Sequence, residues 1–203
     1  YSQDFVYRHA HHGDSVAPMS AAGMIAKPFT TPTSGNLTIV YEGGGLVVEA
    51  LRVDHEPVSP AVGYRFSYGG RTLLISGDTS KSENISRFAE GIDLLVHEAL
   101  SPELIGMMEK TAKNLGNDTL AKIMFDIPDY HASPREAAET ARNAGVGHLL
   151  YYHVVPPIIV PGQETLWLNG AGDIFPDYTV GYDGVSFSLP SNSTEIIQTR
   201  KGM

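Results

Sequence analysis

The stretch Tyr64-Arg-Phe-Ser-Tyr-Gly-Gly-Arg-Thr-Leu-Leu-Ile-Ser-Gly-Asp78 decides the fold class of this sequence. Apolar and polar residues alternate before Gly69 and Gly70, and an apolar run follows them. Because two adjacent glycines can adopt the positive φ angles of a tight turn, the pattern predicts an antiparallel β-hairpin. Its second strand is expected to end just before Asp78, so that a carboxylate follows a buried strand.

A second hairpin precedes this one. Residues 37–41 are β-branched and aromatic, a run of glycines follows, and residues 46–53 are again largely apolar. Two successive hairpins predict a sheet. The chain before residue 37 carries prolines, glycines and other small residues, and residues 1–36 are therefore expected to be an irregular segment that precedes the core.

Helices and strands alternate after the hairpins. Apolar residues at helical spacing over residues 101–130 predict a helical insertion. Ser133-Pro-Arg-Glu136 predicts the start of the next helix, because serine can cap it and glutamate can reach back to the cap. Apolar strands are expected on either side of these helices, and residues 37–203 are interpreted as one α/β domain.

The composition excludes several classes of protein. The 203-residue chain has a formal net charge of −9, which argues against holding a polyanion by bulk electrostatics. It contains no cysteine, so a disulfide scaffold and a cysteine-ligated zinc site are excluded, and both cytoplasm and periplasm stay open as compartments. No apolar run has the ~18 residues of a membrane span. Because the sequence begins at Tyr1 without a signal-peptide pattern, we expect residues upstream of it.

Four polar residues have equivalent places in the predicted fold, because each follows an apolar strand. They are His55, Asp78, His97 and His153. Strand ends in a layered α/β fold meet at a common edge, where ligand sites are often built. Histidine and aspartate are suitable ligands for zinc, so the pattern predicts a zinc site there. The alternative for each residue, a hydrogen-bonded histidine in the core or an aspartate in a turn, stays open.

At these positions the sequence resembles a known family, the ribonuclease Z and arylsulfatase-like branch of the metallo-β-lactamase superfamily. Five segments resemble its motifs in the expected order. They are residues 55–65 (third metal motif), Ser76-Gly-Asp78-Thr (fourth), Val96-His97-Glu98-Ala99 (His-Glu-Ala-Thr), His131-Ala-Ser133 (His-Ser-Thr) and Leu150-Tyr-Tyr-His153 (fifth).

The resemblance implies an αββα sandwich of which this chain is a C-terminal, incomplete portion. The superfamily's His-x-His-x-Asp-His motif is not found. His9-Ala-His11-His12-Gly-Asp14 imitates it, but the aspartate comes one place late and no histidine follows. We interpret this histidine cluster as part of a solvated segment.

The resemblance also implies the chemistry: a complete site holds two zinc ions and generates a hydroxide between them. Asp78 would bridge the two ions, while His55 and His153 would each ligate one. His131, held in one tautomer by Glu98, would protonate the leaving oxygen as general acid. For this chain alone, one zinc ion or none is expected.

His97 is a third candidate catalytic residue. It would either support the site from behind or hydrogen-bond the substrate. The alternative for His97 and Glu98 is a buried pair that braces the strand.

The expected activity is zinc-dependent hydrolysis of an ester, such as a phosphodiester or a sulfate ester, with a small-molecule substrate. Only a plain hairpin stands where ribonuclease Z carries its tRNA-gripping arm, and with the net charge this disfavours nucleic acid as a partner. Two alternatives stay open. The chain could be an inactive fragment or binding module on the same scaffold, or a tRNA 3′-processing endonuclease.

The helical insertion carries Met107, Met108, Met124 and Phe125. These residues would form a lid over the site, or a face for a second copy of the chain or for the missing N-terminal portion. The alternative is that the helices simply pack against the domain.

Overall fold

The computed structural model describes residues 2–18 and 27–200. The chain divides into two compact units, Tyr1–Thr30 and Thr31–Met203. In the first unit, α1 (Ser2–His12) is a helix, whereas the sequence predicts irregular structure there. The physical reason is local: Asp4 lies in the first turn, histidines lie in the last turn, and Arg8 pairs with Asp4 at 2.8 Å. Residues 19–26 of the predicted irregular segment lie outside the described residues.

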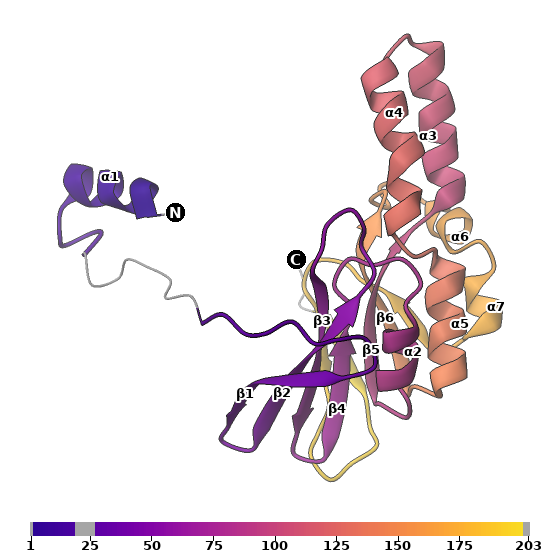
Figure 1. The fold of residues 1–203 in the computed structure, drawn as a ribbon. Helices are drawn as coiled ribbons and strands as arrows, with labels where there is room; N and C mark the ends of the chain where they lie inside the picture. Colours follow the sequence, from indigo (N-terminus) through magenta and orange to yellow (C-terminus); the bar gives the residue numbers. More distant parts are fainter. Residues whose placement is uncertain (1, 19–26, 201–203) are drawn as a thin grey trace. The chain divides into compact units, whose positions relative to one another are not determined.

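The second unit is built on a seven-stranded sheet whose strands stand in chain order (Figure 1). The first four strands form an antiparallel meander, and the last three each run parallel to the strand before. This confirms the two predicted hairpins. The strands are β1 (Leu37–Gly43), β2 (Leu46–Val53), β3 (Ala61–Tyr68), β4 (Arg71–Ile75), β5 (Leu94–Leu100), β6 (His148–Val155) and β7 (Tyr178–Val180).

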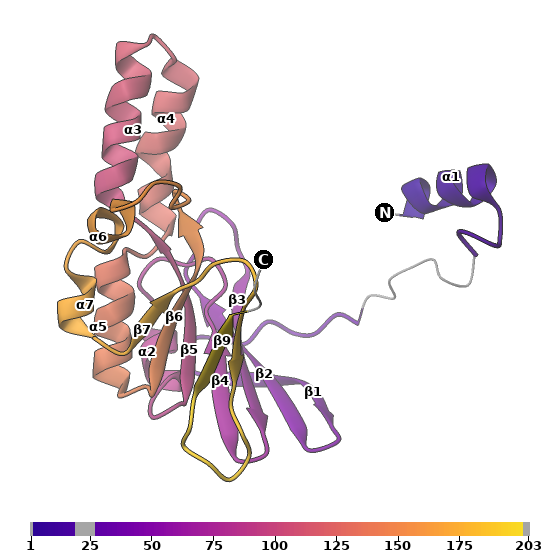
Figure 2. The same ribbon diagram turned by 180° about the vertical axis from the view of Figure 1, so that it is seen from behind.

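Different elements cover the two faces of the sheet. Helices α2 (Glu83–Phe88) and α5 (Pro134–Ala144) lie on one face, and the ribbon formed by β8 (Val185–Ser188) and β9 (Ile197–Arg200) lies on the other (Figures 1 and 2). Short helices α6 (Gln163–Leu168) and α7 (Ala171–Ile174) pack beside α5. The apolar core lies between the helices and the sheet.

Helix α5 begins and ends as its sequence predicts. Ser133 and Glu136 form a reciprocal capping box at its start, and Gly145 ends it in the left-handed conformation with φ of 62°. The helix is fixed to the sheet by Tyr151 of β6, which donates a hydrogen bond to the carbonyl oxygen of Pro134 at 2.8 Å. This hydrogen bond fixes the position of the start of α5 relative to the sheet.

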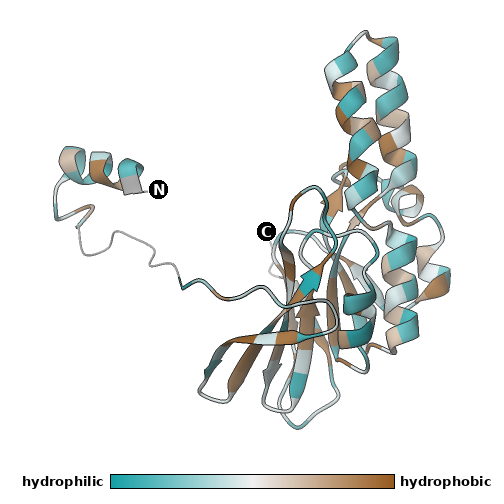
Figure 3. Cartoon of the chain, in the orientation of Figure 1, coloured by the Kyte–Doolittle hydropathy of each residue, from teal (hydrophilic) through white to brown (hydrophobic). Residues whose placement is uncertain are grey.

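Between β5 and α5 the chain forms a helical hairpin, α3 (Pro102–Asn114) and α4 (Asp118–Asp126), followed by a 3₁₀ turn, η2 (Ile127–Tyr130). The helices lie side by side and project beyond the sheet (Figure 1). Figure 3 shows hydrophobic colouring along much of the sheet, whereas both colours occur on the hairpin. The predicted helices are confirmed; their interpretation as an insertion stays a prediction.

Among the helices of the described residues, none has the length and apolar character that crossing a bilayer requires.

Candidate metal centre

Strand direction brings the predicted polar residues to one edge of the sheet. β4, β5 and β6 run parallel, so Asp78, Glu98 and His153 approach the same edge. β2 runs in the direction of β4 because both are antiparallel to β3, and His55 therefore follows β2 at this edge as well. The last member, His131, comes from the segment that leads into α5.

Glu98, His131 and His153 form the candidate metal group of the described residues. Each offers one ligand atom, and these atoms all lie within 4.8 Å of one another. Nδ1 of His131 lies 3.1 Å from Oε1 of Glu98. Nδ1 of His153 lies 4.0 Å from Oδ1 of Asp78, so this carboxylate stands beside the group.

His55 joins the cluster through its ring. The centroids of the His55 and His131 rings are 5.3 Å apart, and those of His131 and His153 are 5.6 Å apart and stacked. Nδ1 of His55 lies 2.8 Å from the carbonyl oxygen of Tyr130. The structure thus brings together all three predicted metal ligands and two of the three predicted catalytic residues.

His153 reaches the cluster through an irregularity of its strand. In the pairing of β5 with β6, Glu98 lies opposite Tyr152 and Ala99 lies opposite Val154, so His153 is an extra residue in the ladder. Its φ angle is 44°, in the left-handed region that residues other than glycine rarely adopt. Such bulges redirect side chains and are frequent next to functional sites. The bulge turns the imidazole toward solvent, where its side chain is 42% exposed.

Glu98 is fully buried, and its surroundings hold it in place. Its Oε1 accepts hydrogen bonds from the backbone N–H groups of Thr79 at 3.0 Å and Ala132 at 3.2 Å. Its Oε2 has no hydrogen-bond partner among the described residues. A buried carboxylate is stabilised by a nearby cation, and protonated His131 or a metal ion can supply one here.

This carboxylate changes the acidity of His131. Burial acts to lower the pKa of His131, but the hydrogen bond to Glu98 and the charges of Glu98 and Asp78 outweigh it, so the pKa is raised above its usual value. His131 is therefore more easily protonated than a free histidine, which suits a proton donor.

His97 lies outside this cluster of side chains. It is 1% exposed, and its Nδ1 lies 2.6 Å from the backbone oxygen of Glu98. Burial lowers its pKa, which keeps the ring neutral. Successive side chains of a strand point to opposite faces, so only Glu98 of this pair reaches the cluster. The role of His97 as a catalytic residue stays a prediction.

The histidines of α1 belong to the other compact unit. His11 and His12 are exposed, and Nδ1 of His9 lies 2.8 Å from the carbonyl oxygen of Ala17.

Sequence reasoning missed three residues that support the cluster. Ser76 accepts the backbone N–H of Glu98 through its hydroxyl at 3.0 Å, Thr79 binds the Glu98 carboxylate, and Tyr130 binds His55. Their positions in the sequence could have indicated these three residues, because each of them lies within three residues of a candidate site residue.

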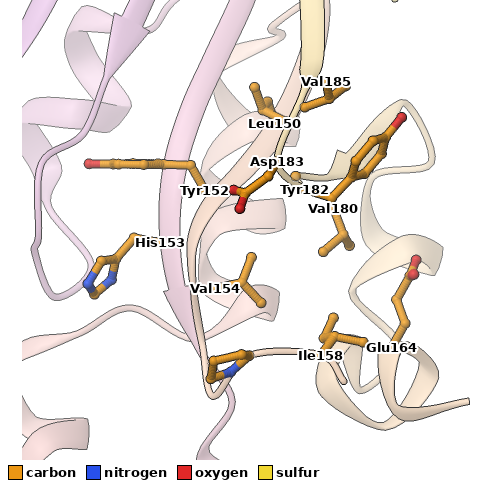
Figure 4. Close-up of a pocket in the computed structure, with 12 residues that line it drawn as sticks. Leu150, Tyr152, His153, Val154, Ile158, Glu164, Val180, Tyr182, Asp183 and Val185 are labelled. Atoms are coloured by element: carbon orange, nitrogen blue, oxygen red, sulfur yellow. The ribbon is translucent and has the colours of Figure 1, made fainter. Parts of the chain in front are cut away.

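A pocket of about 630 Å³ lies beside His153. Its walls are mostly apolar, and it also contains the carboxylates of Glu164 and Asp183. In Figure 4 the side chains of Val154 and Val180 lie between His153 on one side and Glu164 on the other.

A second pocket, of about 610 Å³, lies beside His55 and is lined in part by Glu56, Asp126, Asp129 and Tyr130. Two residues of the cluster, His153 and His55, therefore each line a pocket that also contains carboxylates.

No family model matches the chain. Its sequence is 32% identical to ribonuclease Z of Mycobacterium sp. strain KMS over 176 residues, which is 87% of this chain and 54% of that protein. It is 31% identical to ribonuclease Z of Mycobacterium tuberculosis strain H37Rv over 169 residues, with 82% and 54% covered. The chain thus spans about half the length of these relatives.

Two solved structures are also similar. The metallo-β-lactamase fold protein YhfI from Bacillus subtilis matches with a TM-score of 0.47 and 20% identity, covering 68% of this chain and 47% of that one. The short form of human tRNase Z matches with a TM-score of 0.42 and 26% identity, covering 58% and 39%.

The sequence match includes the whole candidate centre. Any stretch of 176 residues in a chain of 203 contains residues 28–176, and all five clustered residues lie in that range. On this sequence similarity, the chain is ribonuclease Z-like over the stretch that matches these relatives.

Proposed function

We propose that this chain carries the metal-dependent hydrolytic site of a ribonuclease Z-like phosphodiesterase, with zinc as its metal and an RNA phosphodiester as its substrate. One observation carries the proposal: ligand atoms of Glu98, His131 and His153 lie within 4.8 Å of one another, with Asp78 and His55 beside them. This cluster stands in a chain that is 32% identical to a protein named ribonuclease Z.

The choice of substrate corrects the sequence analysis, which disfavours nucleic acid and expects a small ester. The relatives are named ribonuclease Z, and these names support RNA better than a general ester. Because the chain spans about half of their length, the substrate of the whole protein is part of the proposal.

The side chains of the cluster fit zinc, since they offer imidazole nitrogens and carboxylate oxygens. We assign the metal to His55, Asp78 and His153. Asp78 and His153 are each 42% exposed and open to an ion, whereas Oε1 of Glu98 is already engaged by backbone N–H groups. When bound, zinc supplies Lewis-acid polarisation of the ester and lowers the pKa of a water molecule.

Glu98 and His131 then act as a proton-donating pair. Glu98 accepts the hydrogen of Nδ1 of His131, so that the second proton of the imidazolium is held at Nε2. Donation of this proton to the leaving oxygen is worth roughly 10²–10⁴-fold in rate. Two backbone N–H groups, those of Thr79 and Ala132, keep Glu98 in place while the proton moves.

Metal content and hydrolysis of bis(p-nitrophenyl) phosphate test the proposal, measured on this chain and on the full-length protein of its gene. Asp78→Asn is expected to lose both metal and activity. Asp118→Asn is the matched control, because Asp118 is an exposed carboxylate in the first turn of α4. Metal bound in normal amount with no hydrolysis in either form would favour a binding module.

A second candidate function, hydrolysis of small esters, is favoured by the carboxylates in the two pockets. Glu164 and Asp183 line one pocket, and Glu56, Asp126 and Asp129 line the other. Over the described residues, neither pocket is lined by lysine or arginine. Carboxylates repel a polyanion strongly, whereas they repel a small ester with a single negative charge far less.

Competition between substrates separates the two candidates. For the RNA function, precursor tRNA should be cleaved at its 3′ side and should inhibit diester hydrolysis, more strongly at low salt. For the small-ester function, RNA should have no effect on diester hydrolysis at any salt concentration.

A further inference from the structure

We infer that Tyr130 is a positioning residue that fixes the imidazoles of His55 and His131 together. The inference rests on the proposed function for the purpose of these histidines, but its geometry stands without a metal. Tyr130 is the last residue of η2, at the base of the helical hairpin, and His131 follows it directly.

The backbone of Tyr130 decides the tautomer of His55. Its carbonyl oxygen lies 2.8 Å from Nδ1 of His55, 75 residues away in sequence. A carbonyl oxygen can only accept a hydrogen bond, so Nδ1 carries the hydrogen. The lone pair of neutral His55 is then at Nε2, which is the nitrogen left for a metal ion.

The side chain of Tyr130 fixes the orientation of both rings. Its ring centroid lies 5.1 Å from that of His55 at an interplanar angle of 87°, and 5.1 Å from that of His131 at 49°. The two imidazoles are themselves 5.3 Å apart. The three rings therefore form a closed triangle in which the phenol ring packs against both imidazoles.

This arrangement connects the helical hairpin to the candidate site. α4 runs directly into η2 and contacts it, so the hairpin sets where the carbonyl and ring of Tyr130 lie. The hairpin is thereby connected through a single residue to one metal-ligand candidate and to the proton donor. A residue that only filled space would not bind one histidine through its backbone and also pack against both imidazoles.

The test uses the ¹⁵N NMR signals of the histidine side chains in the metal-free chain and the affinity for Co²⁺. In the unchanged chain, His55 should show the tautomer with hydrogen at Nδ1. Tyr130→Phe keeps both the ring and the carbonyl, and should keep the tautomer and an affinity within about twofold of the original. Tyr130→Leu keeps apolar volume but removes the ring, and should weaken Co²⁺ binding about tenfold, as loss of an outer support of a ligand does.

Tyr68→Leu is the matched control, because Tyr68 is an exposed tyrosine at the end of β3. It should change neither signal. The inference would be overturned by a folded Tyr130→Leu chain that binds Co²⁺ as tightly as the original, or by His55 carrying its hydrogen at Nε2. A chain with the expected tautomer that hydrolyses no ester would instead count against the proposed function alone.

Discussion

Strand β4 has a cluster of polar residues at each end, and the two differ in how far the chain itself completes them. At its start, Arg71 is 5% exposed, lies 2.9 Å from the carboxylate of Asp93, and donates to the carbonyl oxygens of Pro190, Ser193 and Glu195. We call this the closed end. Beyond the strand's other end lies the candidate metal centre, where Asp78 and His153 are each 42% exposed.

The two clusters have different roles: one stabilises the fold and the other is available for chemistry. At the closed end, the carboxylate of Asp93 and three carbonyl oxygens bind the guanidinium, while its buried Nε has no hydrogen-bond partner among the described residues, so the charge is paired within the folded chain and stabilises it. At the candidate metal centre, Oε2 of Glu98 is buried without a hydrogen-bond partner among the described residues, and the imidazoles of His131 and His153 are stacked 5.6 Å apart. The two ends therefore differ in exposure: Arg71 is buried with its counter-ion, whereas Asp78 and His153 are each 42% exposed, as expected where a ligand completes a site.

The largest expected effect is at the metal centre. His131→Gln keeps a polar side chain near Glu98 but removes the transferable proton, so kcat/KM for bis(p-nitrophenyl) phosphate should fall by about 10²–10⁴-fold. The free energy of unfolding, measured in urea, should fall by only about 1 kcal/mol, because Glu98 loses its bond with His131 but keeps those from Thr79 and Ala132. A His131→Gln chain that lost stability but kept its activity would show that His131 stabilises the fold and does not take part in hydrolysis.

At the closed end we expect the opposite result. Arg71→Met removes one partner of a largely buried ion pair and three hydrogen bonds to carbonyl oxygens, and should lower the free energy of unfolding by about 3 kcal/mol. Urea unfolding measures this change, and Co²⁺ titration of the folded protein should give unchanged affinity. If the affinity fell as far as the stability, the two ends would not be independent.

The sequence predicts the sheet and most of the residues of the candidate metal centre, because both depend on local patterns. Alternation and paired glycines give the hairpins, and apolar runs place His55 and Asp78 just past β2 and β4, whereas His153 lies within β6, which continues to Val155. Parallel direction then brings the strand ends together, which needs no knowledge of exact register.

Features that depend on exact register or on distant backbone could not be predicted. The bulge at His153 is set by the ladder with β5, and the choice of Glu98 over His97 depends on which face each side chain takes. The partners of Arg71 lie 119–124 residues further along the chain. Tyr130 holds His55 through a backbone oxygen, which leaves no sign in the identity of the residue.

A smaller effect is expected at the helix cap that follows the metal centre. Ser133→Ala removes the hydroxyl that accepts the N–H of Glu136 and should cost about 1 kcal/mol of stability. His131 lies two residues earlier and is held by Glu98, so activity should stay within about twofold. Thermal unfolding and kcat/KM measure the two quantities. A large loss of activity would mean that the cap, rather than Glu98, fixes His131.

The smallest effect is the acid sensitivity of the closed end. Partial burial acts to raise the pKa of Asp93, but hydrogen bonds from Arg71 and Thr72 and the charge of Arg71 outweigh it, so the pKa lies below its usual value. A lowered pKa in the folded state means that the unfolded chain binds the proton first. The stability that Asp93 contributes is therefore complete above the unfolded pKa of about 4 and is lost as the pH falls through the lower folded value.

Asp93→Asn tests this assignment, since asparagine cannot titrate. The difference in unfolding free energy between the original chain and this variant should be constant from pH 7 to pH 5 and should shrink below pH 4. Urea unfolding at a series of pH values measures it. A difference that stayed constant below pH 4 would show that the acid response of the chain does not come from Asp93.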